Sequence, residues 1–517
     1  MNQNHGPDDK STRIISGSVY REGIGSGLDI FGKLRAGRYK AKSPESGLNL
    51  DVIATHAAQA ISISLTFVIL IAGVWILKLI FMELISGATL LSWQANSQFG
   101  HQFWGFIARV FTVLNISLGI VGALAVAYEK VYLRWSIPRK FLKKNYRKNM
   151  NISIIEPLDS KIVKPLSKSL KNRVLLSSGR KSQNVITFGG FRPFLGAGEK
   201  VAGWSLSIPR TSTDGHTPVN IPLYDFYKVV EDEVERKNLP NIQKTSKLYV
   251  NGLELEVDGQ ILQSVASRPV AKLPENQIWA LAQSSKLNNK RVYRIYRYYD
   301  RERDMMLSYF LRFYNVGNVT FAEGVTYTLP SIDRDRFSLT PLLNDSKTSR
   351  VIKTLILAAI LFPFNIYTLI ALWHLIIYLF NVVSWWANDV KQLRAAKAQE
   401  EYNYGLTETF RESVAAPTYQ NYYGIQDLTM YWQTLDRAIV KGILDLLKQN
   451  NVDTSAFEDS TKNIINNGVM MNGGEFTASQ VAVGNKSVSM MKSDNPSPRT
   501  GGRLQRTLSQ IMPNTQN

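Results

Sequence analysis

The chain has 517 residues and a formal net charge of +20, with 61 Lys and Arg residues against 41 Asp and Glu residues, and it contains no cysteine. The lack of cysteine excludes disulfide bonds, thiolate catalysis and zinc sites built on sulfur. In a chain with long apolar runs, a basic excess of this kind is typical of cytoplasmic loops and of contact with anionic lipid, so we do not expect nucleic acid as a partner.

Residues 1–51 are polar and basic, and we predict a cytoplasmic arm there. An uncharged run from Val52 to Leu77 follows, and a second apolar run extends from Val110 to Tyr128. A helix needs about 20 apolar residues to cross a bilayer. The two runs predict a transmembrane hairpin over residues 52–128, with spans at about 57–78 and 108–128 and the uncharged stretch 84–108 as an outer loop.

Directly after the second run, eight basic residues occur between positions 130 and 148 without any acidic residue. The positive-inside rule places such a segment in the cytoplasm. We expect these side chains to contact anionic lipid headgroups. They are Lys130, Arg134, Arg139, Lys140, Lys143, Lys144, Arg147 and Lys148.

Residues 129–353 combine this basic segment with a domain of mostly strand-like pattern. Short β-prone runs lie at 151–156, 173–177 and 184–188, and the apolar residues of 223–237 have helical spacing. Asn251-Gly252 predicts a tight hairpin between 247–250 and 253–257. A second hairpin, 291–299 with 306–314, and a further strand at 319–328 complete a predicted cytoplasmic α+β domain with an antiparallel sheet.

Arginine and tyrosine alternate along the first strand of that second hairpin. Arg294 and Arg297, beside Tyr296 and Tyr298, could hold a phosphate or single-stranded nucleic acid through charge and stacking. A sheet with one basic face near anionic lipid has the same composition, and we favour that interpretation.

No catalytic constellation is visible in the sequence. The five histidines are not paired at metal-ligand spacing, and Gly196-Ala197-Gly198-Glu199-Lys200 lacks the ending of a P-loop. We therefore expect no enzyme activity, no catalytic residue, no metal and no cofactor.

A third apolar block covers residues 354–388 and contains Pro363-Phe364-Asn365. Its length exceeds one span and falls short of two, so the membrane part has three or four spans. Proline can open a turn, and basic residues flank both ends, which favours a re-entrant hairpin with the C-terminus inside. One long tilted helix over about 364–386, with the C-terminus outside, is the alternative.

Residues 389–426 are predicted to form a charged helix and a linker, and residues 489–517 have the composition of a disordered tail. Between them, residues 427–488 combine an amphipathic helix with a Gly/Asn-rich β-turn motif. We expect a protein partner or a second copy of the chain to cover the apolar stripe of this helix. The stripe consists of Leu428, Tyr431, Leu435, Ile439, Ile443 and Leu446.

Several segments resemble known bacterial proteins. RPFLGAG (192–198), GWSLSIPR (203–210) and RVYRIYR (291–297) are similar to segments of a group of uncharacterised bacterial multi-span membrane proteins. NGGEFTA (472–478) and VAVGN (481–485) resemble the C-terminal tails of bacterial conflict and defence-associated proteins. The resemblance implies a bacterial inner (plasma) membrane protein of an immune or stress-response system, and it supplies no catalytic residues.

Two functions are open at this point. The first is a membrane-anchored, non-enzymatic interaction or sensor protein, which the large cytoplasmic middle and the apolar stripe favour. The second is an oligomeric channel or pore-forming effector, whose polar lining would come from residues within the apolar runs. Candidates for that lining are Ser62, Ser64, Asn115, Ser117, Asn365 and His374.

Overall fold

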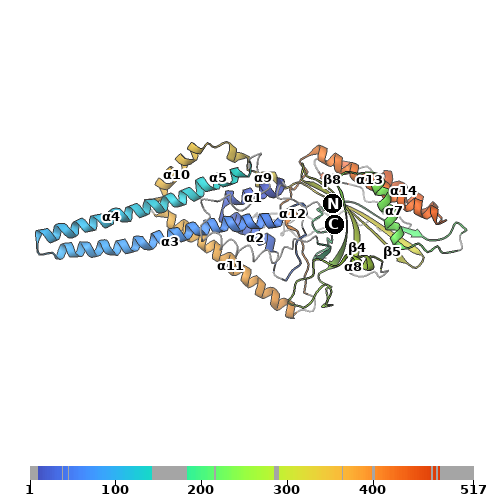
Figure 1. Ribbon diagram of the computed structural model, residues 1–517, viewed down its shortest axis with the longest axis horizontal. Coiled ribbons are helices and arrows are strands. Elements are labelled where there is room, and N and C mark those ends of the chain that lie inside the picture. The colour runs from blue at the N-terminus through green and yellow to red at the C-terminus, as the bar shows by residue number, and fades with distance from the viewer. Residues whose placement is uncertain are drawn as a thin grey trace, which may run out of the picture.

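The computed structural model describes residues 10–142, 183–283, 290–398 and 402–466, apart from 36, 38, 45, 215–216 and 364, together with the short strands 470–472 and 475–477. These residues form a long helical part with a sheet domain at one end (Figure 1). The predicted disordered tail at 489–517 and the predicted strands at 151–156 and 173–177 lie outside the described residues.

Two long antiparallel helices, α3 (Leu50–Gln94) and α4 (Gln98–Ala127), form a shaft. Asn49 caps α3 by accepting from the Val52 N–H, and Ser97 caps α4 by accepting from the Gly100 N–H. The prediction that residues 84–108 form a loop is wrong, because both helices continue through this stretch and only residues 95–97 form the turn. Its location outside the membrane stays a prediction.

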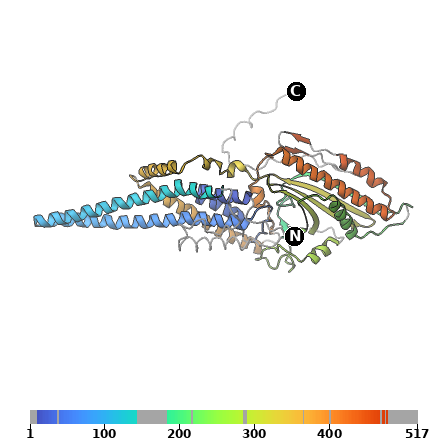
Figure 2. The same ribbon diagram turned by 45° about the horizontal axis from the view of Figure 1, so that its top comes forward.

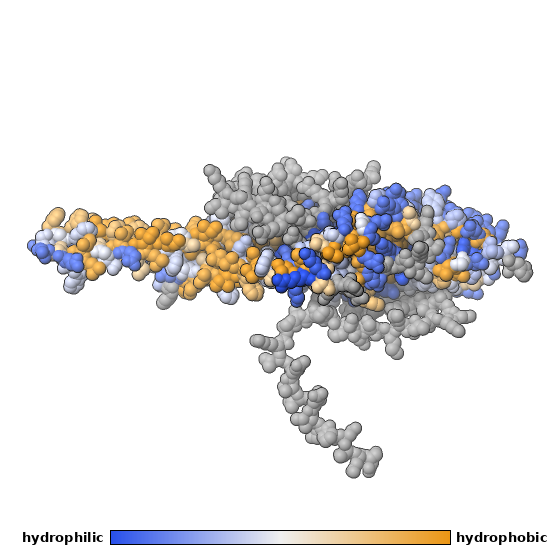
Figure 3. Space-filling model, turned by 90° about the horizontal axis from the view of Figure 1, so that it is seen from below, coloured by the Kyte–Doolittle hydropathy of each residue, from blue (hydrophilic) through white to orange (hydrophobic). Residues whose placement is uncertain are grey.

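Among the described residues, three helices are long and apolar enough to cross a membrane by length and composition. They are Leu50–Gln94, Gln98–Lys140 and Ile366–Ala398. On the face shown in Figure 3 the shaft is mostly apolar, whereas the sheet domain has more polar residues. A large exposed apolar surface of this kind is what a bilayer or another protein covers.

From residue 10, where the described residues begin, the arm predicted for residues 1–51 is instead part of the helical core. α1 (Lys10–Glu22) and α2 (Ile24–Arg35) pack against the first half of α3, with Ile15, Val19 and Phe31 buried. Ser, Gly and Arg residues between these apolar positions raise the average polarity, which hides a buried face. Large exposed apolar side chains on α3 begin only at Ile69, further along the helix than the start of the predicted span at 57–78.

At the sheet-side end of the shaft, α4 continues into a π-helical turn, η1 (Tyr128–Leu133), and then into α5 (Arg134–Lys140). After the strands of the sheet domain, the chain forms α9 (Arg334–Phe337), the 3-10 turn η3 (Thr340–Leu343) and α10 (Lys347–Leu361).

The third apolar block folds back on itself. α10 ends at Leu361, the chain turns through Pro363 and Asn365, and α11 (Ile366–Ala398) returns toward the sheet domain (Figure 1, Figure 2). Just before α10, the Asp345 carbonyl accepts from Arg139, and near the end of α11 Asp389 pairs with Arg35. Both ends therefore lie at the sheet-side end of the shaft. The fold-back agrees with the hairpin interpretation, whereas the single span-length helix, α11, agrees with the alternative, so the choice between three and four spans stays a prediction.

Six strands form one sheet in the order β1-β3-β4-β5-β6-β2. Four of the neighbouring pairs are antiparallel, but β1 pairs parallel with β3, with Val185 opposite Leu248. The sheet is mixed, so the purely antiparallel prediction is wrong. The reason is that β2 and α7 (Leu223–Arg236) separate β1 from β3 in the chain, a connection long enough for two strands to pair in parallel. The strands are β1 (Val185–Phe188), β2 (Glu199–Pro209), β3 (Ile242–Asn251), β4 (Lys290–Asp300), β5 (Met305–Val316) and β6 (Val319–Leu329).

The hairpin predicted at Asn251-Gly252 does not form. β3 ends at Asn251, and residues 253–257 are not a strand. The Gly252 N–H donates to the Phe188 carbonyl at 2.7 Å, and a Cβ on Gly252 would lie 2.2 Å from the Gly405 nitrogen. A close approach of two backbones explains this glycine, rather than a two-residue turn.

Helices cover one face of the sheet and bury the predicted docking stripe. α7 (Leu223–Arg236) and α13 (Tyr422–Gln449) lie on that face, α14 (Ser455–Asn466) contacts α13 and β2, and α8 (Glu275–Gln283) contacts β3 and β4. All six stripe residues are buried in this core. The expectation that another molecule covers them is therefore wrong, because the chain's own sheet and α7 do so. They are Leu428, Tyr431, Leu435, Ile439, Ile443 and Leu446.

The linker predicted within 389–426 is folded as well. α11 continues to Ala398, Leu406 forms a β-bridge with Phe188, and the one-turn helix α12 (Phe410–Ser413) is largely buried. Its polar composition conceals three aromatic or apolar residues, Tyr402, Tyr404 and Leu406, that pack at the sheet edge. Beyond α14, β7 (Met470–Asn472) and β8 (Glu475–Thr477) form a separate two-stranded sheet.

Candidate functional site

Lys78, midway along α3, meets the turn of the α10–α11 hairpin. Its Nζ donates to Asn365 Oδ1 at 2.8 Å and to the Tyr367 hydroxyl at 3.3 Å, and Asn115 Nδ2 donates to the Lys78 carbonyl at 2.9 Å. All three partner side chains are neutral. We call Lys78, Asn115, Asn365 and Tyr367 the tip cluster.

The tip cluster combines a cation with an interruption of the helical backbone. Asn365 has a φ of 50°, a left-handed conformation that asparagine tolerates better than most residues. The Lys78 ammonium lies beside the turn that joins the C-terminal end of α10 to the N-terminal end of α11. A charged side chain between apolar helices is energetically costly, and such residues usually mark a pathway or a switch.

Two glycines of α4 allow the hairpin to approach the shaft. A Cβ at Gly119 would lie 2.9 Å from the Phe362 ring, and a Cβ at Gly122 would lie 2.6 Å from the Tyr367 ring. Small residues permit this kind of close helix packing in membrane proteins.

We expect Gly122→Leu to displace Tyr367 and to destabilise the full-length protein in detergent by about 1–3 kcal/mol, because overpacking forces side chains out of their preferred rotamers. The measurement is the thermal unfolding midpoint. Gly73→Leu is the matched control, since a Cβ at Gly73 on α3 meets no atom within 4 Å. Equal midpoints for the two variants would contradict this packing.

The tip cluster contains two of the six residues predicted to line a channel, Asn115 and Asn365. Ser62 and Ser117 instead donate to carbonyls of their own helices, and Ser64 donates to Glu129. His374 lies half-buried on α11. The sequence therefore indicated two members of the cluster but not their partner Lys78, which lies 287 positions from Asn365 in the chain.

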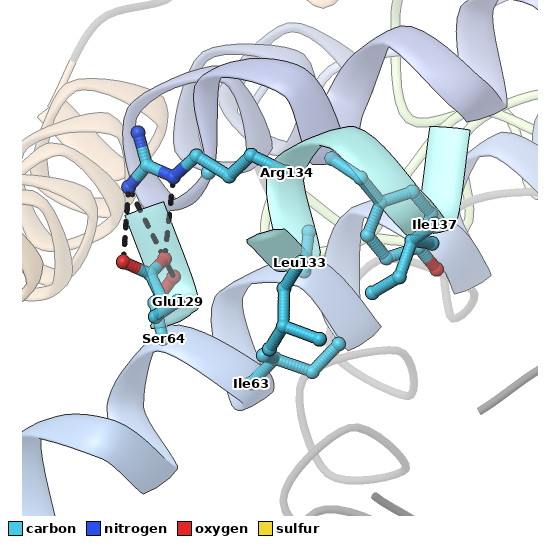
Figure 4. A pocket seen from close by; sticks show the side chains of 9 residues that line it. Ile63, Ser64, Glu129, Leu133, Arg134 and Ile137 are labelled. Atoms are coloured by element: carbon cyan, nitrogen blue, oxygen red, sulfur yellow. Dashed lines mark hydrogen bonds and ion pairs between the residues drawn. The ribbon is translucent and has the colours of Figure 1, made fainter. Parts of the chain in front are cut away.

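A second polar group lies at the sheet-side end of the shaft, which we call its base, where η1 interrupts the α-helical backbone. Arg134 Nη2 and Glu129 Oε1 are 3.1 Å apart, and the Ser64 hydroxyl donates to the same carboxylate oxygen (Figure 4). These side chains border a cavity of about 20 Å³, large enough for one water molecule. π-Helical turns occur frequently at functional sites.

The basic residues predicted to contact lipid do not form one free patch. Arg134 is engaged with Glu129, and the Arg139 guanidinium lies 4.6 Å from the centroid of the Trp135 ring. Lys130 is half-buried and Lys140 is partly exposed. Contact of the segment with anionic lipid stays a prediction, but Arg134 serves the helix packing instead. Lys143, Lys144, Arg147 and Lys148 lie outside the described residues.

The Arg/Tyr cluster of β4 is divided between the two faces of the sheet. Tyr296 and Tyr298 are buried on the helix-covered face, where the Tyr298 ring stacks on Tyr431 with centroids 3.7 Å apart. On the same face, Arg294 pairs with Glu231 at 2.7 Å. The predicted nucleic-acid contact is wrong for these three residues, because α7 and α13 occupy their face. Arg297 points to the opposite face, since side chains alternate along a strand.

A buried ion pair connects α12, which follows α11 in the chain, to the sheet domain. Arg411 Nη2 and Asp304 Oδ2 are 3.1 Å apart, and the side chains are 1% and 3% exposed. Arg411 also donates to the Pro330 carbonyl, and Asp304 accepts from the Ile332 N–H and the Tyr299 hydroxyl. Nothing in the sequence indicated this pair, whose members lie 107 positions apart.

The residue after Arg411 holds the loop between β1 and β2. Glu412 Oε1 accepts from the Gly196 N–H at 2.9 Å and the Gly198 N–H at 3.2 Å. Both glycines have positive φ, 78° and 89°, so the glycine-rich run serves a tight turn. The same loop inserts the Phe194 ring among Tyr249, Tyr293, Phe310 and Tyr327 on the face of the sheet opposite α7 and α13, where these side chains form a buried cluster.

Asp436 on α13 is a buried carboxyl group between the helix and the sheet. It accepts from the Tyr309 hydroxyl at 2.6 Å and from Trp204 Nε1 at 3.2 Å. Burial raises the pKa of Asp436 to about 6. The folded state therefore binds this proton more tightly than the unfolded state, so the contribution to stability is fully present below pH 4 and is lost as the pH rises through 6.

We expect Asp436→Asn to remove that pH dependence, because the amide keeps an acceptor and never ionises. Relative to the variant, the wild type should lose about 3 kcal/mol of stability between pH 3 and pH 8, at 1.36 kcal/mol per pKa unit. The measurement is the unfolding midpoint against pH, with Asp445→Asn on the same helix as control. Parallel curves for wild type and Asp436→Asn would contradict the raised pKa.

Within the described part of the chain, no group of three or more His, Asp or Glu residues could hold a metal ion. The sequence profile of a family described as AbeC-like domain matches residues 203–479, more than half of the chain. The matched region includes β3–β6, the α10–α11 hairpin and α13. No curated protein and no solved structure matches the chain.

Proposed function

The chain belongs to the AbeC-like family, and from this premise we propose that it is a non-enzymatic, multi-pass protein of a bacterial plasma membrane that acts as a sensor in a defence or stress response. The sheet domain faces the cytoplasm and receives the signal. The α10–α11 hairpin transmits the signal into the membrane. The extent of the AbeC-like region supports this assignment, because it holds most of the sheet and the whole hairpin in one unit.

The observation that carries the proposal is the continuity of α11. This helix of 33 residues extends from Tyr367 in the tip cluster to Ala396, which is buried in the sheet domain with Leu248 and Tyr404. At 1.5 Å per residue, such a helix is about 50 Å long. A displacement at its sheet end is therefore carried directly to Lys78.

The charge distribution supports a cytoplasmic sheet domain. Arg139, Lys140, Arg350 and Lys353 lie at the sheet-side end of the shaft and hairpin, whereas residues 84–108 at the opposite end contain no charged residue. Basic residues concentrate on the cytoplasmic side of membrane proteins.

Single cysteines test the orientation, because the chain has none of its own. A membrane-impermeant maleimide should label Asn96→Cys, in the α3–α4 turn, in intact cells. It should label Lys228→Cys, exposed on α7, only after lysis. The opposite pattern would place the sheet domain outside and overturn the proposal.

Transmission is tested at Leu369, which is 63% exposed near the tip cluster. We expect Ala396→Asp, which disrupts the packing of α11 in the sheet domain, to change the labelling rate of Leu369→Cys several-fold in membrane vesicles. Lys391→Asp, exposed on the same helix, is the control. An unchanged rate in the Ala396→Asp protein would contradict transmission through α11.

A channel is the second candidate, and the tip cluster favours it. Irregular backbone at membrane depth is tolerated where it is buried in protein or lines a water-filled cavity. A lysine at such a point would select anions. Within one chain, Val68 and Ile71 form an apolar layer with Ala123 and Val126 between Lys78 and the base of the shaft, so a passage requires several copies.

Glu83 and Arg109 indicate how copies would meet. Both are exposed at the same height on the shaft, as the contact of the Phe81 and Phe111 rings at 5.9 Å shows. Neither forms an ion pair with another described residue, and in a bilayer each requires a partner. Oxidation of a Glu83→Cys, Arg109→Cys double variant should produce cross-linked species above the dimer, while each single variant stops at the dimer.

Reconstituted protein should conduct chloride, and Lys78→Met should abolish this flux. The absence of flux in the wild type would rule out the channel as a candidate function.

A further inference from the structure

The face of the sheet opposite α7 and α13 carries two positively charged side chains, Lys247 and Arg297, whose role the fold does not explain. On β3 and β4, Lys247 lies opposite Tyr293, and Arg297 lies opposite Gln243 and Ser308. These positions share one face, because directly paired residues of antiparallel strands point the same way. Lys247 and Arg297 are half-buried, and Thr245 between Lys247 and Gln243 on β3 is exposed. Ile295 lies between them on β4 and is buried, whereas Thr245, opposite Ile295 on β3, is exposed, so the two cations are reached by solvent from the side of β3.

Neither cation forms an ion pair with a carboxylate in the described part of the chain. The Arg297 Nε donates to the Ser308 hydroxyl at 3.2 Å. Burial lowers the pKa of Lys247 to about 7, with a further contribution from Arg297, and burial also lowers the pKa of Arg297. Two like charges in such surroundings destabilise each other, so Lys247 loses its proton near neutral pH unless an anion stabilises its charged form.

Two described carboxylates of the neighbouring strand and turn are already engaged. Glu323 accepts from the Tyr293 hydroxyl at 3.1 Å and lies opposite Arg312 across β5 and β6. Asp304 is paired with Arg411. Among the described residues, neither of these carboxylates is paired with Lys247 or Arg297.

We propose that Lys247 and Arg297 bind a small phosphate-bearing anion on this face of the sheet. The planar guanidinium offers a fork of N–H donors that matches phosphate oxygens, and the ammonium adds a point charge. The Ser308 hydroxyl supplies a third polar group. This inference rests on the proposed sensor function and names the class of ligand that the sheet domain reads.

The position of the site explains how its occupancy would reach the hairpin. Tyr249 and Tyr293, which flank Lys247 on β3 and β4, contact the Phe194 ring of the glycine-rich loop. The amides of that loop are bonded to Glu412, next to Arg411 in α12. Only the side chain of Tyr249 or Tyr293 would therefore separate an anion beside Lys247 from the glycine-rich loop, which is bonded to Glu412 of α12.

Binding is tested on the full-length protein in detergent with sodium pyrophosphate and glycerol 1-phosphate as probes, against sodium chloride at equal ionic strength. Glycerol 1-phosphate represents a lipid headgroup, and pyrophosphate represents a soluble ligand. We expect at least one probe to raise the unfolding midpoint by several degrees, as a ligand at many times its Kd does. Arg297→Gln and Lys247→Gln should each weaken binding at least tenfold by calorimetry, whereas Lys228→Gln, exposed on α7, should not.

Without ligand, Lys247→Gln should unfold at the wild-type temperature or above, because it removes one of two mutually repelling charges. This result separates loss of binding from loss of folding. No shift with either probe, or equal binding by wild type and Arg297→Gln, would overturn the site. If the probe binds through both residues but leaves the labelling rate of Leu369→Cys unchanged, the anion site stands and the sensor function fails.

Discussion

Replacing Arg411 with methionine should destabilise the sheet domain by about 3–5 kcal/mol, because the change leaves the Asp304 carboxylate buried without its cation. Arg411 Nε and Nη1 are buried without a hydrogen-bond partner among the described residues, so removing them also relieves an unfavourable contribution. We therefore expect the lower end of this range. For a domain of this size, 1 kcal/mol corresponds to about 2–4 °C in the unfolding midpoint.

Lys448→Met is the matched control for Arg411→Met. Lys448 also forms an ion pair, with Glu458 at 2.9 Å, but the two side chains are 55% and 43% exposed. An exposed pair contributes about 0–1 kcal/mol, so its loss should barely change the midpoint. A double variant, Arg411→Met with Asp304→Asn, should recover part of the lost stability. Equal midpoints for Arg411→Met and Lys448→Met would show that the ion pair of Arg411 and Asp304 does not stabilise the domain.

Leu435→Ala should cost about 2–5 kcal/mol, because it opens a cavity at a fully buried position between α13 and the sheet. The effect should appear in purified protein with no other molecule present. That condition matters, because alanine would cost little stability in the free protein if another molecule covered the stripe instead of the sheet. The measurement is the unfolding midpoint of the full-length chain in detergent.

Met430→Ala on the same helix is the control for Leu435→Ala. Met430 is 52% exposed, so its truncation removes little buried surface and should change the midpoint by less than about 1 kcal/mol. If both variants unfold together with the wild type, α13 is not part of the core, and the stripe is again open to a partner.

The failed expectations have a common physical origin. Residues 1–51 and 389–426 have the average polarity of an arm and a linker, yet Phe31, Tyr404 and Arg411 are buried in them. Average polarity does not show which few side chains face a core. The apolar stripe on α13 was recognised correctly, but periodicity describes one helix and does not say which surface covers it.

Arg297 and its neighbours show the same limit on the sheet. The alternation of Arg294, Tyr296, Arg297 and Tyr298 established a strand and suggested one mixed basic and aromatic surface. The fold instead assigns three of these residues to the helix-covered face and leaves Arg297 beside Lys247 on the other. Which face is covered depends on α7 and α13, which lie far from β4 in the sequence.

Local patterns in the sequence determined the three long apolar helices, the turn at Pro363-Asn365, the strands β4–β6 and the amphipathic helix α13, because uncharged length and side-chain period act between near neighbours. Only the tertiary structure decided the parallel pairing of β1, the contact of Lys78 with Asn365 and the burial of Arg411 against Asp304. The members of these pairs lie 63, 287 and 107 positions apart, from Val185 to Leu248 in the first case. These contacts result from the packing of the whole chain, and the local periodicity of side chains does not predict them.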